Sequence, residues 1–138
     1  MTPRPPHAHV VVHVTPEDVV LIRRVRQGRV YYLAPGVAVR SNETPGAAAV
    51  RAGREELGLE VAVDEMLHAQ AFGGVDHFFF AAAALSEIGD EVLVPGADDF
   101  ELEGELEGSY EIATLPARML LAYDVRPWEL AQIIARAA

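Results

Sequence analysis

The sequence has no cysteine and no long apolar run. The absence of cysteine from its 138 residues excludes disulfide bonds and thiolate metal sites. No apolar stretch approaches the roughly 18 residues that a membrane-spanning helix requires, and the start of the chain lacks the apolar core of a secretory signal. We therefore expect a cytoplasmic protein that does not span a membrane. Residues 1–7 are expected to form a flexible tail.

Basic residues are scarce. The chain has 11 Lys and Arg against 21 Asp and Glu, for a net charge of −10. Unspecific binding to nucleic-acid backbones needs a basic surface, so we expect no nucleic-acid partner. A phosphate-containing substrate is compatible with this charge if metal ions lie between it and the protein's carboxylates. Much of the acidic charge lies in residues 98–111, which are most simply interpreted as a solvated loop.

Apolar residues make up 51% of the chain, which suits one domain, residues 1–138, with a substantial core. Apolar patterning and turn signals predict strands, a helix, more strands and a final helix. Thr44 is expected to cap the first helix and Gly58 to end it. This order predicts an α+β or α/β sandwich, with helices packed on a mixed sheet. The expected strands are 9–14, 19–26, 29–33, 60–63, 67–72, 75–85, 91–94 and 109–115, and the expected helices are 45–57 and 127–137; Trp128, Leu130, Ile133 and Ile134 lie near one face of the second helix.

The segment from Gly36 to Leu59 carries the clearest chemical signal. Arg51 and Glu55 are four residues apart on the predicted helix, so they can pair. Glu55 and Glu56 lie near the helix C-terminus, where the helix dipole disfavours acids. Such carboxylates, with Glu43 in the preceding loop, indicate a divalent cation, because hard ions prefer oxygen ligands and bridge to phosphates. From composition alone, an ordinary surface helix remains the alternative.

This segment resembles the Nudix box, G-x5-E-x7-R-E-U-x-E-E-x-G-U, where U is a bulky apolar residue. The resemblance extends to the flanking segments 20–24, 31–36, 77–80 and 126–130, and so covers most of the chain. It implies the Nudix fold, a mixed β-sheet sandwiched between α-helices. The residues at the family spacing are Glu43, Arg51, Glu55, Glu56, Gly58 and Leu59, with Gly36 beside the position of the first glycine.

The box also departs from the family pattern. Val37 stands at the first glycine, Ala52 replaces an acid and Gly53 replaces an apolar residue; Arg40 and Asn42 stand where relatives often carry Glu and Gly. In the family, positions 52, 55 and 56 share one helical face and present three carboxylates to Mg²⁺ or Mn²⁺. Glu55 and Glu56 remain as the catalytic and metal-binding candidates. The loss of one ligand should weaken metal binding.

Further site residues follow from the resemblance or from side-chain chemistry. Glu43 and Arg51 are interpreted as a structural pair that holds the loop against the helix. Arg23 and Arg24 can contact phosphate through their guanidinium groups, and exposed strand charges are the alternative. Aromatic strand residues can stack on a base or belong to the core: Tyr31, Tyr32 and Phe79. The family usually adds an acid from outside the box, and spacing does not choose among Glu101, Glu103, Glu105, Glu107 and Glu111.

The histidines give a weaker signal. His7, His9 and His13 alternate along one side of a predicted strand. We interpret this spacing as a coincidence rather than as a metal site. His68 and His77 lie in later predicted strands and are expected to pack in the sheet or to line a pocket.

The resemblance implies a pyrophosphohydrolase that cleaves a nucleoside diphosphate linked to another moiety. Mg²⁺ or Mn²⁺ would neutralise charge and lower the pKa of a bound water. The alternative is an inactive Nudix-fold module that binds or senses a nucleotide, which the departures at Val37, Ala52 and Gly53 favour. A structural or interaction role is a third interpretation. Family members often dimerise, so a homodimer is expected.

Overall fold

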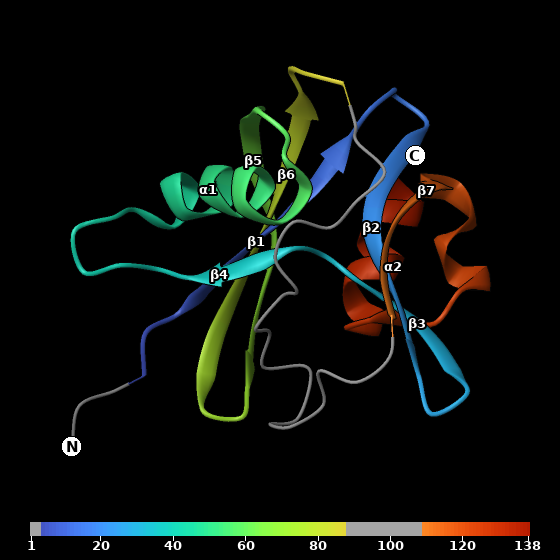
Figure 1. The fold of residues 1–138 in the computed structure, drawn as a ribbon, viewed down its shortest axis with the longest axis horizontal. Coiled ribbons are helices and arrows are strands. Elements are labelled where there is room, and N and C mark those ends of the chain that lie inside the picture. The colour runs from blue at the N-terminus through green and yellow to red at the C-terminus, as the bar shows by residue number, and fades with distance from the viewer. Residues whose placement is uncertain (1–3, 88–108) are drawn as a thin grey trace.

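The computed structural model describes residues 4–87 and 109–138. In these residues an eight-stranded sheet has the order β5-β6-β1-β2-β3-β8, with β4 paired to β1 and β7 paired to β2 (Figure 1). The sheet is mixed, because β1 pairs with β6 and β3 with β8 in parallel, whereas the other pairs are antiparallel. The elements are β1 (His7–His13), β2 (Asp18–Arg26), β3 (Arg29–Leu33), β4 (Gly36–Ala38), α1 (Pro45–Leu57), β5 (Val61–Phe72), β6 (Val75–Ala84), β7 (Ser109–Pro116), the 3₁₀ helix η1 (Ala117–Ala122), β8 (Val125–Arg126) and α2 (Trp128–Ala137).

Strand β1 shows how the sheet divides the core into two layers. Successive side chains of a strand point to opposite faces. Val10 and Val12 accordingly belong to the apolar cluster that contains the alanines of α1. Val11 belongs to the second cluster, which contains residues of η1 and α2. The two helices therefore cover opposite faces of the sheet, as the predicted sandwich requires.

Local signals determine the ends of α1. The Thr44 hydroxyl accepts a hydrogen bond from the Ala47 N–H at 3.1 Å, and Pro45 occupies the first turn. Gly58 adopts the left-handed conformation, with φ 67°, and its N–H donates to the carbonyl of Arg54. The predicted bounds of this helix are confirmed. The turns at Gln27-Gly28 and Gly73-Gly74 also form as predicted, with positive φ at all four residues.

The structure corrects several sequence-based expectations. His7 is buried within β1, so the expected tail does not include it. The predicted extended segments 60–63 and 67–72 form one long strand, β5, which register shifts interrupt near Met66. The sequence did not predict β4, η1 or β8, and the predicted strand 91–94 lies outside the described residues.

Helix α2 forms as predicted, but its buried face differs. Trp128 is 45% exposed, whereas Leu130, Ala131 and Ile134 are buried and Ile133 is half-buried. The first residue of the helix therefore lies outside its apolar face. No helix in the described part of the chain is long and apolar enough to cross a membrane.

Candidate active site

Glu56 is a buried carboxylate at the C-terminal end of α1. Only 2% of the residue is exposed. Its Oε2 accepts a hydrogen bond from the Gly36 N–H at 3.1 Å. Because Gly36 begins β4, this bond ties the last turn of the helix to the sheet. The bond also compensates part of the cost of placing a carboxylate inside the protein.

Arg51 joins the loop before α1 to the helix. Its Nε and Nη2 donate to the two carboxylate oxygens of Glu43 at 3.0 and 2.9 Å, and Nη2 also donates to the Ala38 carbonyl at 2.8 Å. The Glu43 carboxylate accepts a further bond from the Arg40 N–H. The hydrogen bonds from Arg51 are the main cause that lowers the pKa of Glu43 to about 2. The predicted pairing of Glu43 with Arg51 is confirmed.

Glu55 has surroundings different from those of Glu56. Its side chain is 41% exposed, and both carboxylate oxygens lie near Arg51 Nη1, at 3.3 and 3.4 Å. Arg51 therefore orients Glu55 as well as Glu43. The two adjacent carboxylates of the last helical turn thus have separate supports, a guanidinium for Glu55 and a backbone N–H for Glu56.

Ala52 lies on the buried side of α1. It is fully buried and belongs to the apolar cluster between the helix and the sheet. The next residue, Gly53, also packs closely, because an added Cβ would lie 3.3 Å from a methyl of Val61. The departures at these two positions are therefore compatible with tight packing of α1 on the sheet. Glu55 and Glu56 are the two acids of α1, so the helix itself offers two carboxylates rather than three.

Gly36 is in close contact with His9. A Cβ added to Gly36 would overlap the His9 ring, with Cε1 only 2.5 Å away. His9 is fully buried, and its ring stacks on Phe79 at a centroid distance of 4.4 Å. The glycine at position 36, beside the family's glycine position, is thus required by its cross-strand neighbour.

Three histidines come together behind this glycine. His9 Nε2 lies 2.8 Å from His77 Nδ1, and the rings of His7 and His77 are 5.3 Å apart. All three side chains are buried. The sequence grouped His13 with His7 and His9, but His13 lies at the other end of β1. There it lines a groove that includes neither His7 nor His9. The parallel register of β1 and β6, which pairs His7 with His77, was the information missing from the sequence pattern.

Comparison with known proteins identifies the family. The family model for the NUDIX domain matches residues 3–119. This chain belongs to the Nudix family. No curated protein matches the sequence.

Solved structures, among them Nudix hydrolases, share the fold at low sequence identity. A Nudix-family hydrolase from Clostridium perfringens has a TM-score of 0.65 and 18% identity, over 97% of this chain and 94% of that one. The Nudix hydrolase RenU from M. smegmatis has a TM-score of 0.63 and 19% identity, over 99% and 86% of the two chains. The E. coli ORF135 protein gives 0.61 and 18%, over 96% and 87%. These similarities confirm the predicted Nudix fold.

The three candidate substrate residues of this Nudix protein have different surroundings. Arg23 is 34% exposed and pairs with Glu111 at 3.4 Å. Arg24 is fully buried, with its guanidinium 4.2 Å from the centre of the Tyr110 ring. Tyr31 is buried beneath Arg126, whose guanidinium lies 3.9 Å from the ring centre. In this conformation only Arg23 presents its side chain to solvent.

The other two aromatic candidates belong to the core. Tyr32 is buried edge-on against Tyr123, and Phe79 is buried beneath His9. Their core interpretation is thus confirmed.

The donor chemistry at the end of α1 fits a hard divalent cation with few protein ligands. Glu55 and Glu56 offer oxygen donors, which Mg²⁺ and Mn²⁺ prefer. Among residues 4–87 and 109–138, no group of three or more His, Asp or Glu is placed to hold a metal ion. Of the five acids expected to supply a further ligand, Glu111 pairs with Arg23, and those at 101, 103, 105 and 107 lie outside the described residues.

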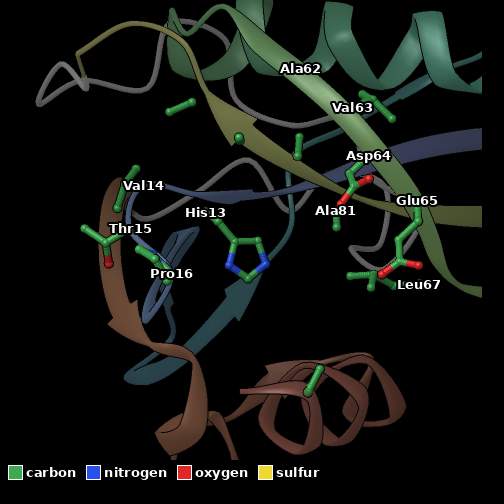
Figure 2. A pocket seen from close by; sticks show the side chains of 14 residues that line it. His13, Val14, Thr15, Pro16, Ala62, Val63, Asp64, Glu65, Leu67 and Ala81 are labelled. Carbon is green, nitrogen blue, oxygen red and sulfur yellow. The ribbon is translucent and has the colours of Figure 1, made fainter.

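A separate groove of about 740 Å³ opens between the sheet and the end of α2. Figure 2 shows the His13 ring turned into this groove, with Asp64 and Glu65 of β5 to one side. Burial lowers the pKa of His13. The lining includes none of the box carboxylates. The groove is therefore distinct from the candidate active site.

Proposed function

We propose that this Nudix protein is a divalent-metal-dependent hydrolase of a nucleoside diphosphate linked to another moiety. The observation that carries the proposal is the pair of supported carboxylates at the end of α1. Arg51 orients Glu55, and the Gly36 N–H orients Glu56. Preorganised ligands of this kind favour a metal site, because little rearrangement is needed on binding.

In this proposal Glu55 and Glu56 hold Mg²⁺ or Mn²⁺ and are the catalytic residues. When bound, the ion would supply charge neutralisation at the diphosphate and a water of lowered pKa. Arg51 holds Glu55 in place, while Glu43 aligns Arg51. The half-exposed Arg23 can bind a phosphate oxygen if it exchanges its exposed partner Glu111 for the substrate. Buried Arg24 and Tyr31 would support the site from within the sheet.

The test is hydrolysis of a panel of nucleoside diphosphate derivatives with Mg²⁺ or Mn²⁺, followed by chromatography. Glu56→Gln keeps the shape of the side chain and removes its charge, so turnover should fall by at least about tenfold. Glu60→Gln is the matched control, because Glu60 forms an exposed ion pair with Arg54 of the same helix. The assignment of Glu56 is contradicted if Glu56→Gln keeps the metal-dependent turnover of the parent. It is also contradicted if Glu60→Gln loses as much turnover as Glu56→Gln.

The second candidate is a Nudix module that binds a nucleotide without cleaving it. The buried Ala52 favours it, because this position contributes packing where the family pattern has a carboxylate. For such a module, nucleotides should raise the melting temperature without product formation. For a hydrolase, both a raised melting temperature and product formation are expected. For a protein with an interaction role, neither is expected.

Two expectations accompany the proposal, a cytoplasmic location and a homodimer. A homodimer would have twice the chain mass of 15.0 kDa in light scattering. A monomer at working concentrations contradicts that expectation without affecting the proposed reaction.

A further inference from the structure

His9 of β1 contacts residues 34–36, the segment that leads into the Nudix box. His9 Nδ1 lies 3.3 Å from the carbonyl oxygen of Ala34. The same ring packs against the α-carbon of Gly36, in the place where a Cβ would otherwise lie. In addition, the Val10 N–H donates to the Pro35 carbonyl at 2.9 Å. Strand β1 therefore contacts three successive residues, 34 to 36, the last of which carries the amide that anchors Glu56.

When the His9 ring is neutral, its two polar contacts fit one arrangement of protons. A carbonyl oxygen can only accept, so His9 Nδ1 carries the hydrogen that is shared with Ala34. In the neutral ring, Nε2 is then the acceptor. His77 Nδ1, at 2.8 Å, must therefore donate to it. His77 thus selects the tautomer of His9 that binds the Ala34 carbonyl.

The contact has a direct consequence for Glu56. The Gly36 N–H donates to Glu56 Oε2, and its direction depends on how the chain enters Gly36. His9 has little freedom to move, because it is fully buried, stacked on Phe79 and bonded to His77. The Gly36 N–H shares a peptide plane with the Pro35 carbonyl, which the Val10 N–H also holds. A displaced Ala34 carbonyl would shift that plane through Pro35 and weaken the bond to Glu56.

We propose that His9 is a positioning residue of the Nudix site. Its Nδ1–H holds the Ala34 carbonyl so that the Gly36 amide points at Glu56, and His77 maintains the tautomer that does so. Neither histidine touches substrate or metal in this role. The inference rests on the proposed function for its effect on metal binding, but not for its effect on the Gly36 amide.

Three histidine variants test the proposal. His9→Phe keeps a ring of similar size and removes both nitrogens. His9→Asn keeps an N–H near the position of Nδ1, so it should restore the bond to Ala34. His68→Phe is the matched control, because His68 also lies against Phe79, at 5.9 Å between ring centres, but bonds to Gln70 rather than to the box segment.

Two readouts follow the site without turnover. Amide hydrogen exchange of Gly36, measured by NMR, reports its bond to Glu56. Exchange should become roughly fivefold faster in His9→Phe, as expected for the loss of a hydrogen bond. The dissociation constant for Mn²⁺, measured by electron paramagnetic resonance, should rise about tenfold, as for other residues that orient metal ligands. His9→Asn should recover most of both losses, and His68→Phe should stay within about twofold of the parent.

The outcomes separate the two proposals. Unchanged Gly36 exchange in His9→Phe, or a His9→Asn variant no better than His9→Phe, overturns the positioning role. If His9→Phe does not fold, His77→Phe takes its place, with faster Gly36 exchange expected and unchanged exchange overturning the role. A parent protein that binds no Mn²⁺ contradicts the proposed function, while the exchange comparison still decides the role of His9.

Discussion

Replacing Gly36 by alanine should destabilise the protein through one identifiable contact. The φ angle of Gly36 is not positive, so its backbone conformation accepts an L residue. The obstacle is the His9 ring, whose Cε1 would lie 2.5 Å from the new Cβ. The ring cannot easily move away, because it is hydrogen-bonded to His77 at one edge and stacked on Phe79 at one face. We therefore expect overpacking rather than backbone strain.

The magnitude follows from overpacking of a buried site. Inserting a methyl group into a filled core costs about 1–3 kcal/mol. In a domain of this size that cost lowers the melting temperature by about 3–12 °C. Gly46→Ala is the matched control. Gly46 also lies in the box, but nothing lies within 4 Å of its added Cβ. This change should be neutral or slightly stabilising.

A double-mutant cycle with His9→Ala tests the cause. Removing the ring makes room for the new methyl group, so Gly36→Ala should cost at least about 1 kcal/mol less in that background. The assay is equilibrium denaturation of the parent, both single variants and the double variant. Additive costs would refute the assigned contact. A cost for Gly36→Ala no larger than that of Gly46→Ala would also refute it.

Three further predictions concern the box. Arg51→Met should destabilise the protein by about 2–3 kcal/mol in chemical denaturation, because it leaves Glu43 without its main partner; a loss below about 0.5 kcal/mol contradicts the structural role. The lowered pKa of Glu43 means that its ionised form stabilises the fold; this contribution is complete above pH 4.5 and is lost as the pH falls towards about 2. The free energy of unfolding, measured as a function of pH, should lack this contribution in Glu43→Gln. A pH dependence equal to that of the parent would refute the prediction. Ala52→Glu should cost about 3 kcal/mol in the same assay, because it places a carboxylate in the apolar cluster; a stable variant with tighter Mn²⁺ binding would show instead that the helix can present a third ligand.

The sequence by itself determined the features that depend on neighbouring residues. Helix α1 has its predicted bounds because Thr44 caps one end and Gly58 ends the other within single turns of the chain. The hairpin turns form where glycine permits positive φ. The pairing of Arg51 with Glu55 follows from helical spacing, and the box spacing sufficed to indicate the family.

Only the tertiary structure decided which of these residues are buried and what they contact. Arg23 and Arg24 are adjacent in the sequence, but alternate directions along β2 leave one half-exposed and bury the other. Likewise, the sequence placed Ala52 on a face shared with both glutamates, whereas packing on the sheet buries it in the core. Burial of this kind depends on which element covers each face, which local propensity does not encode.

The histidine cluster is the clearest example of such a decision. His9 and His77 are 68 residues apart, and neither has a local signal that predicts the other as its partner. They meet because β1 and β6 pair in parallel, with His7 opposite His77 and His9 opposite Phe79. A shift of one residue in this register would turn the side chains of one strand to the opposite face of the sheet and separate the two histidines. The sequence therefore determined the bounds of α1, the two hairpin turns and the spacing of the box residues. The long-range register of the sheet decided which histidine lies against Gly36, because that contact exists only after distant strands have paired.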